Sequence, residues 1–136
     1  MKCIYCGGDT KVNNSRLQKR SNTIWRRRKC LQCGNVISTI ESINYESTLR
    51  VKLTDGKFTV FDPNILMISI YESVKHRSNP IKDASELTRT ITNKILDRSQ
   101  PVIEIEDISE TTIATLKNFD NVASVHYSAF HRSSNG

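Results

Sequence analysis

The chain has 136 residues, of which 37% are hydrophobic and 25% are charged, a composition typical of a folded protein and not of a disordered segment. No apolar run is long enough to span a membrane, and no apolar segment follows the N-terminal Met-Lys-Cys as in a secretion signal. We therefore expect a cytoplasmic protein without a membrane partner.

The net charge of +6 is unevenly distributed along the chain. Residues 1–45 carry nine Lys or Arg against Asp9 and Glu41, a net charge of +7, whereas residues 46–136 carry eleven against twelve Asp or Glu, a net charge of −1. This asymmetry predicts two domains, 1–45 and 46–136, of which the first binds a polyanion. Nucleic acid is favoured over an anionic membrane because no basic amphipathic helix is present, and a merely solvated run of charge is the alternative.

All four cysteines lie in two CxxC pairs, Cys3 with Cys6 and Cys30 with Cys33, and Gly7 and Gly34 follow these pairs. Each CxxC turn places two thiolates at adjacent corners of a tetrahedron, and the glycine permits the positive φ that such a turn needs. In a reducing compartment the doubled motif predicts a metal site and not disulfides. Zn²⁺ is the expected ion, with iron in a rubredoxin-like site as the competitor. A closed site of this kind is structural, and about 45 residues with few large apolar side chains need the metal in order to fold.

The residues between the two cysteine pairs predict short strands at 10–12 and 23–25, with turns at 13–15 and 21–22. Residues 35–43 alternate in a strand-like way, so the segment reads as a zinc ribbon. Seven of its nine Lys and Arg are the predicted DNA-binding residues: Arg16, Lys19, Arg20, Arg26, Arg27, Arg28 and Lys29. Arg26 and Arg28 should face one side of the sheet, and Arg27 and Lys29 the other. Trp25 could stack on a base, although a small ribbon core is its commoner use.

From Leu49 onward the pattern predicts a β-hairpin around Asp55-Gly56, followed by about four helices. Asp62 and Pro63 mark the start of the first helix, whose dense apolar residues predict burial on more than one side. Further helices are expected at about 83–98, around 108–116 and over 122–130, with a short extended piece at 102–105. The fold class is therefore α+β, a zinc ribbon followed by a mainly helical domain with an N-terminal hairpin.

Nothing in the second domain predicts catalysis. Its three histidines have no neighbouring Ser or Cys nucleophile, and no phosphate-binding glycine motif is present. The acidic residues near 104–110 lie at a helix start, where the macrodipole favours them. We therefore expect the protein not to be an enzyme.

The chain resembles the NrdR family, bacterial regulators of ribonucleotide reductase genes. The ribbon resemblance rests on "MKCIYCGGDTKV", "RRRKCLQCG" and "STIE", and "RVKLTDGKFTVFD" and "NVASVHYSAFHRS" resemble the start and end of the family's ATP-cone. The resemblance implies a repressor whose ribbon binds double-stranded DNA at promoter repeats, and whose cone binds adenine nucleotides, ATP or dATP, and changes the homo-oligomeric state. It also implies nucleotide binding at Val51, Lys52, Phe61 and Arg77.

The chain departs from the family pattern at several charged positions. In the ribbon Trp25 replaces an arginine and Lys29 replaces a glutamate. In the cone Leu53-Thr54 stands where the family has Lys-Arg, Ile65 stands where lysine is common, and Lys52 lies one place early, which turns its side chain to the other face of the strand. A triphosphate needs such cations. The alternative function is therefore a nucleic-acid-binding protein whose cone serves only for oligomerisation.

Overall fold

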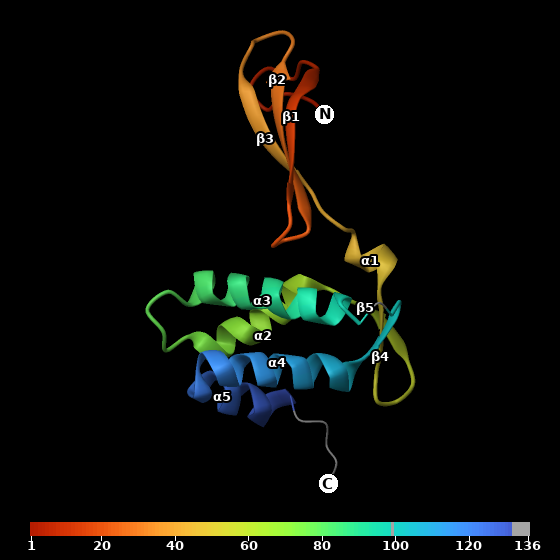
Figure 1. Cartoon of the computed structure of the whole chain (residues 1–136), viewed down its shortest axis with the longest axis vertical. Helices are drawn as coiled ribbons and strands as arrows, with labels where there is room; N and C mark the ends of the chain where they lie inside the picture. Colours follow the sequence, from red (N-terminus) through yellow and green to blue (C-terminus); the bar gives the residue numbers. More distant parts are fainter. Residues whose placement is uncertain (99, 132–136) are drawn as a thin grey trace. The chain divides into compact units, whose positions relative to one another are not determined.

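The computed structural model describes residues 1–98 and 100–131. The chain divides into two compact units, Met1–Ile43 and Asn44–Gly136, which we call the ribbon and the helical unit (Figure 1). The division falls two residues before the boundary drawn from the sequence, because Tyr45 packs edge-on against Phe61 of the helical unit with ring centroids 5.7 Å apart. The α+β class expected from the sequence is confirmed.

The ribbon is an antiparallel sheet in the order β1-β2-β3, formed by Thr10–Gln18, Thr23–Cys30 and Val36–Glu41. The first two strands extend well beyond the predicted 10–12 and 23–25, and the turn predicted at 13–15 is wrong. Asn14 and Ser15 pair with Arg27 and Arg26, and the pairing register shifts between Val12 and Asn14. Continuous pairing with β2 thus overrides the turn preference of two asparagines and a serine. The turn at 21–22 is confirmed, with Asn22 at φ +50°.

The helical unit contains a second sheet in the order β5-β4-β6, formed by Phe58–Val60, Arg50–Lys52 and Val102–Glu104. Strands β4 and β5 form the predicted hairpin, with Gly56 at φ +84° in its turn. The extended piece predicted near residue 102 is β6, which pairs with β4 in parallel. A short helix α1, Tyr45–Thr48, precedes β4 and was not predicted.

Four longer helices complete the helical unit: α2 Pro63–Val74, α3 Pro80–Leu96, α4 Ile105–Phe119 and α5 Asn121–His131. Helices α2 and α3, α3 and α4, α4 and α5, and α5 and α2 are in contact, so the four close into a ring around one core (Figure 1). The side chain of Asp62 caps α2 as expected, accepting a hydrogen bond from the Asn64 amide at 2.9 Å. Helix α3 begins three residues earlier than predicted, because Pro80 occupies its first turn.

The core of the helical unit is apolar and comes from all four long helices, with Ile70, Val74, Ile91, Ile95 and Leu116 almost fully enclosed. Burial of α2 on more than one side is wrong, because α2 packs through one stripe and leaves Ile65 and Ile68 65% and 63% exposed. Helix α5 likewise buries Ala123 and Tyr127 but exposes Val122, Val125 and Phe130. Within the described residues, no helix combines the length and apolar character that crossing a membrane requires.

Candidate functional site

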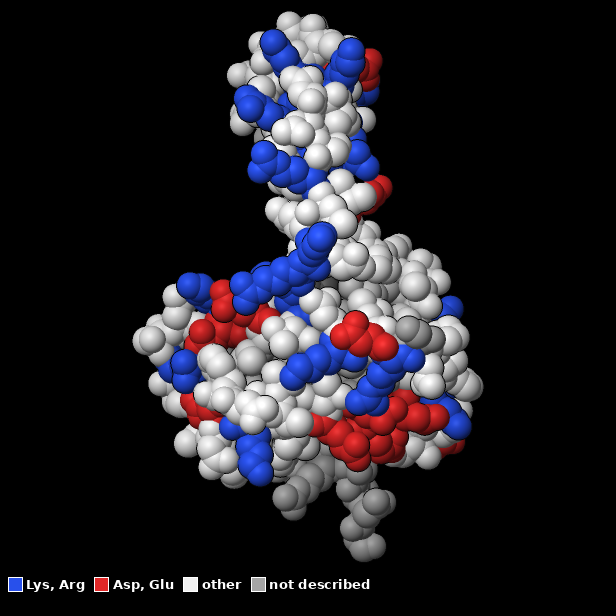
Figure 2. All heavy atoms as spheres, in the orientation of Figure 1, with Lys and Arg blue, Asp and Glu red and all other residues white. Residues whose placement is uncertain are grey.

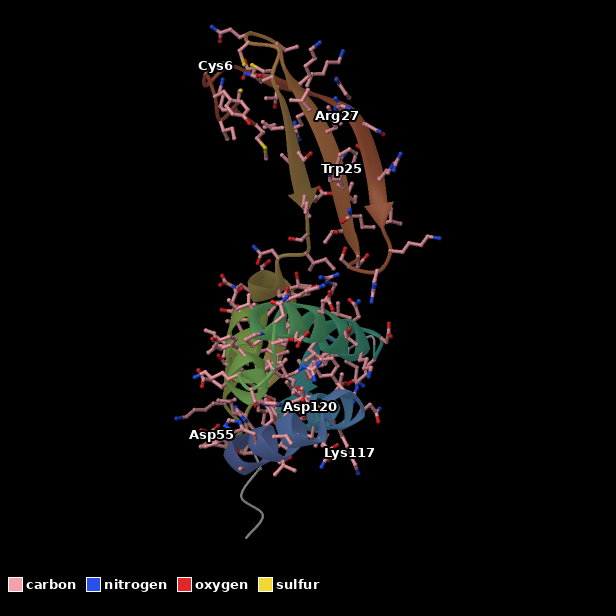
Figure 3. The ribbon with its side chains drawn as sticks, turned by 90° about the vertical axis from the view of Figure 1, so that its left-hand side faces the viewer. Cys6, Trp25, Arg27, Asp55, Lys117 and Asp120 are labelled. Atoms are coloured by element: carbon pink, nitrogen blue, oxygen red, sulfur yellow. The ribbon has the colours of Figure 1, made fainter. Side chains whose placement is uncertain are left out.

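The four cysteine sulfurs converge at one end of the ribbon. All four lie within 4.8 Å of one another, with Cys3 and Cys33 3.7 Å apart and Cys6 and Cys30 3.5 Å apart (Figure 3). Gly7 and Gly34 have φ values of +75° and +74°, as the two CxxC turns require. In residues 1–98 and 100–131 no other group of histidine, cysteine or carboxylate side chains converges in this way. Four thiolates at this spacing fit a tetrahedral Zn²⁺ ion.

Backbone amides around the cysteines favour the thiolate form that binds metal. The amides of Gln32 and Cys33 each donate to the Cys30 Sγ at 3.4 Å. The Cys33 amide has the largest effect on the pKa of Cys30, and together these hydrogen bonds lower that pKa to about 6. The Gly8 amide donates to Cys6 Sγ at 3.4 Å and acts to lower the pKa of Cys6, but the neighbouring thiols of Cys30, Cys33 and Cys3, together with burial, raise that pKa to about 11. In both turns, backbone amides therefore donate hydrogen bonds to cysteine sulfurs without the need for a bound metal.

One face of the ribbon sheet carries Lys and Arg side chains and neither Asp nor Glu. Cross-strand partners share a face, and the pairing places Arg16 opposite Trp25, Asn14 opposite Arg27, and Lys11 opposite Lys29. On β3 the partners of this face are Ile40, Ser38 and Val36. We call this set the cation face: Lys11, Asn14, Arg16, Trp25, Arg27, Lys29, Val36, Ser38 and Ile40. It contains no Asp or Glu, and Figure 2 shows the Lys and Arg side chains spread over the ribbon.

The opposite face holds its arginines in contacts within the sheet. Arg26 donates to Ser15 Oγ at 2.9 Å and lies 3.5 Å from a carboxylate oxygen of Glu41. Arg28 donates to Thr39 Oγ1 at 3.4 Å. Both arginines are half-buried, whereas Arg27 and Lys29 are exposed, which confirms the alternation predicted for the four residues.

The remaining two predicted DNA-binding residues lie in a turn, and Trp25 lies on the cation face. Lys19 and Arg20 lie in the exposed turn between β1 and β2. Trp25 is half-buried on the cation face and comes from the same strand as Arg27 (Figure 3). The buried apolar residues of the ribbon are Cys3, Cys30 and Ile37, so Trp25 is not enclosed in a core.

The helical unit contains a cavity of about 590 Å³ between the β4–β5 hairpin, the starts of α2 and α4, and the end of α5. Val51 and Phe61 line it, but the other two residues predicted to bind nucleotide do not. The Lys52 ammonium lies 3.7 Å from the Glu104 carboxylate on the neighbouring strand β6. The Arg77 guanidinium binds Asp83 at 2.7 Å and Asp120 at 3.0 Å.

The charges that line this cavity do not fit a nucleoside triphosphate. Its acidic lining residues are Asp55, Asp62 and Glu106, and within residues 1–98 and 100–131 neither Lys nor Arg lines it. These three carboxylates do not converge as ligands of one metal ion. Phosphate groups would meet negative charge without a compensating ion.

A charged cluster that was not predicted from the sequence lies where α2 and α4 end and α5 begins. His76 Nε2 lies 2.8 Å from Asp120 Oδ2, the same oxygen that Arg77 contacts, and the Arg77 guanidinium lies over the Phe119 ring at 4.3 Å. The partners are 43 and 44 residues apart in the chain, so no local pattern signals their contact.

Fold and site together define a protein that joins a four-cysteine zinc ribbon to a hairpin-and-helix unit. The N-terminal domain of transcriptional repressor NrdR-like proteins matches residues 1–41. Transcriptional repressor NrdR of Thermoanaerobacter sp. strain X514 is 34% identical over 133 residues, which cover 97% of this chain and 84% of that protein. The same-named protein of Heliobacterium modesticaldum is 31% identical over 97% of this chain and 87% of its own length, and that of Methylobacterium nodulans is 32% identical over 97% and 68%. The chain belongs to the NrdR family.

Proposed function

We propose that this protein is a non-enzymatic transcriptional repressor that binds double-stranded DNA through the cation face of its zinc-bearing ribbon. The observation that carries the proposal is the segregation of Arg16, Arg27 and Lys29 onto one face without acids. Arginine can bind phosphate bidentately and read guanine edges, whereas lysine acts as a point charge. Promoters of ribonucleotide reductase genes are the target that the family resemblance implies.

The experiment is fluorescence-anisotropy binding of the zinc-loaded protein to a reductase-promoter fragment and to a scrambled control. Arg27→Ala should weaken promoter binding by a factor on the order of 10, as expected when one phosphate or base contact is lost. Arg28→Ala is the matched control from the same strand, because Arg28 binds Thr39 on the other face. Equal losses for the two variants would contradict the assignment of the DNA-binding face.

We propose further that the repressor acts as a homo-oligomer. A single small ribbon makes only a handful of base contacts, each worth roughly 1–3 kcal/mol, which is too little to select one site among many. The exposed apolar residues Val122, Val125 and Phe130 on α5 support assembly through the helical unit. Several ribbons would then read promoter repeats together.

Control by ATP or dATP is the effector mechanism that the family resemblance implies. The acidic lining of the cavity favours a second candidate, in which the helical unit assembles the protein and adenine nucleotides do not change DNA binding. The anisotropy experiment separates the two when it is repeated with no nucleotide, with ATP and with dATP. A shift of promoter affinity by dATP relative to ATP supports nucleotide control, and identical curves support the second candidate.

A further inference from the structure

The cavity of the helical unit is a built pocket with an apolar floor. Val51, Phe61, Leu66 and Tyr127 line it and are each at most 6% exposed. Burial raises the pKa of the Tyr127 phenol, which therefore stays neutral. A volume of about 590 Å³ lies in the range of small-molecule sites, and an apolar floor with a few polar groups at the edge is their usual composition.

Carboxylates form the charged part of this pocket. Asp55 comes from the hairpin turn, Asp62 from the start of α2 and Glu106 from the first turn of α4. Figure 2 shows acidic side chains gathered on the helical unit. Asp62 is engaged by the Asn64 amide, and Asp55 by the amide and the ammonium of Lys57. Glu106 is half-buried and has no hydrogen-bond or ion-pair partner in the part of the chain that the structure describes.

Among the described residues neither Lys nor Arg lines the pocket, and the Lys57 ammonium lies 3.9 Å from the Asp55 carboxylate at its edge. Lys52 pairs with Glu104 outside the pocket, and the Arg98 guanidinium lies 3.1 Å from Asp107 and donates to Thr111 Oγ1. His131 lines the pocket but stacks on the Tyr127 ring with centroids 4.0 Å apart. A ligand that enters this pocket therefore meets apolar surface and an unpaired carboxylate, which disfavours an anion and favours a cation.

We propose that this pocket binds a small apolar molecule that carries a cationic amine and no phosphate. The apolar body occupies the floor formed by Val51, Phe61 and Tyr127, and the ammonium group faces Glu106. This ligand class has the opposite charge to the adenine nucleotides that the family resemblance implies. The inference concerns the helical unit alone and does not depend on the DNA-binding proposal.

The test uses three probes of similar shape and different charge: phenethylamine, 2-phenylethanol and 3-phenylpropionate. Each is titrated into the full-length zinc-loaded protein, and the backbone amide NMR shifts of Val51, Phe61 and Ile108 report on the pocket. Phenethylamine should bind about tenfold more tightly than 3-phenylpropionate, because the Glu106 carboxylate attracts the ammonium group and repels the carboxylate. ATP and dATP, with and without Mg²⁺, should leave these amides unshifted.

Two variants test the role of Glu106. Glu106→Gln should abolish the preference for phenethylamine over 2-phenylethanol while 2-phenylethanol still binds, which shows that the pocket remains folded. Glu110→Gln is the matched control, because Glu110 is exposed on the same helix and does not line the pocket. Leu53→Lys places a cation in the pocket and should reverse the order, so that 3-phenylpropionate binds more tightly than phenethylamine.

Three outcomes would overturn the inference. In the first, ATP or dATP shifts the pocket amides of the unmodified protein. In the second, 3-phenylpropionate binds as tightly as phenethylamine. In the third, none of the three probes shifts these amides at millimolar concentration. Because no DNA is present, none of these results bears on whether the ribbon binds a promoter.

Discussion

At the scale of single residues, Asp120 joins the ends of three helices of the helical unit. It follows α4, its carboxylate contacts His76 and Arg77 beyond the end of α2, and its Oδ1 accepts a hydrogen bond from the Ala123 amide in the first turn of α5 at 3.2 Å. The hydrogen bond with His76 is the largest influence on its pKa, and with the Ala123 amide and Arg77 it lowers that pKa from 3.8 to about 2. Asp120 is thus both a helix cap and an ion-pair partner.

The two roles of Asp120 can be separated by substitution. Asp120→Ala removes the cap and the charge and should cost about 1 kcal/mol or more of unfolding free energy, whereas Asp120→Asn keeps a side chain that can cap and should cost less. Urea unfolding followed by helical circular dichroism measures both. Equal losses for the two variants would show that the charge, and not the cap, carries the effect.

The depressed pKa of Asp120 also predicts the sign of a pH effect. A carboxylate whose pKa is lower in the folded state stabilises the fold above its unfolded pKa, near 3.8, and loses that contribution as the pH falls towards 2. The stability difference between the unmodified protein and Asp120→Asn should therefore shrink as the pH falls from 3.8 towards 2. A difference that grows on acidification would contradict the ion-pair role of this residue.

At the scale of elements, the ribbon strands have too little apolar contact to fold without a metal. Within residues 1–43, all of which the structure describes, the buried residues are Cys3, Cys30 and Ile37. The sheet is otherwise held by backbone pairing and exposed side chains, and a unit of this size needs an additional link. Zn²⁺ bound by the four cysteines supplies it.

Zinc removal should therefore unfold the ribbon and leave the helical unit intact. A chelator should shift the fluorescence of Trp25, the single tryptophan of the chain, to longer wavelength as its half-buried ring becomes exposed. Helical circular dichroism should change little, because every described helix lies in the helical unit. Added zinc should restore the fluorescence, and Cys33→Ser should resemble the chelated protein. An unchanged Trp25 spectrum after metal removal would contradict the structural role of zinc.

The same elements show which features the sequence could predict. The cysteine cluster and the cap at Asp62 follow from local spacing, since a CxxC turn or an N-cap is formed by neighbouring residues. The length of β1 depends on its pairing with β2, and the parallel pairing of β6 with β4 joins segments distant in the chain, so neither was predicted. The residues that line the pocket, among them Asp55, Glu106 and His131, likewise come from separate elements. Local patterns predict local contacts, and the rest is decided by tertiary packing.

At the scale of the whole molecule, the net positive charge lies in the ribbon region, and the helical unit carries exposed apolar residues on α5. Val122 and Val125 are three residues apart and share one side of α5, where they form an exposed apolar stripe, and Phe130 is exposed near the end of the same helix. Assembly through α5 would bring several cationic ribbons onto one DNA molecule. The apparent affinity would then exceed that of one ribbon by the effective concentration of the second.

A charge introduced into this stripe tests the coupling between assembly and DNA binding. Val125→Glu should lower the mass measured by light scattering and weaken binding to a promoter with repeated sites by about tenfold or more, because the avidity of linked ribbons is lost. Affinity for scrambled DNA should change less, and the dependence of promoter binding on salt should become shallower, because fewer phosphates are contacted. Ser85→Glu adds the same charge at an exposed position of α3, a helix that does not carry the stripe, and should leave mass and affinity unchanged. If Val125→Glu keeps its mass and its promoter affinity, α5 is not the assembly surface, and the ribbons must be brought together by another part of the chain.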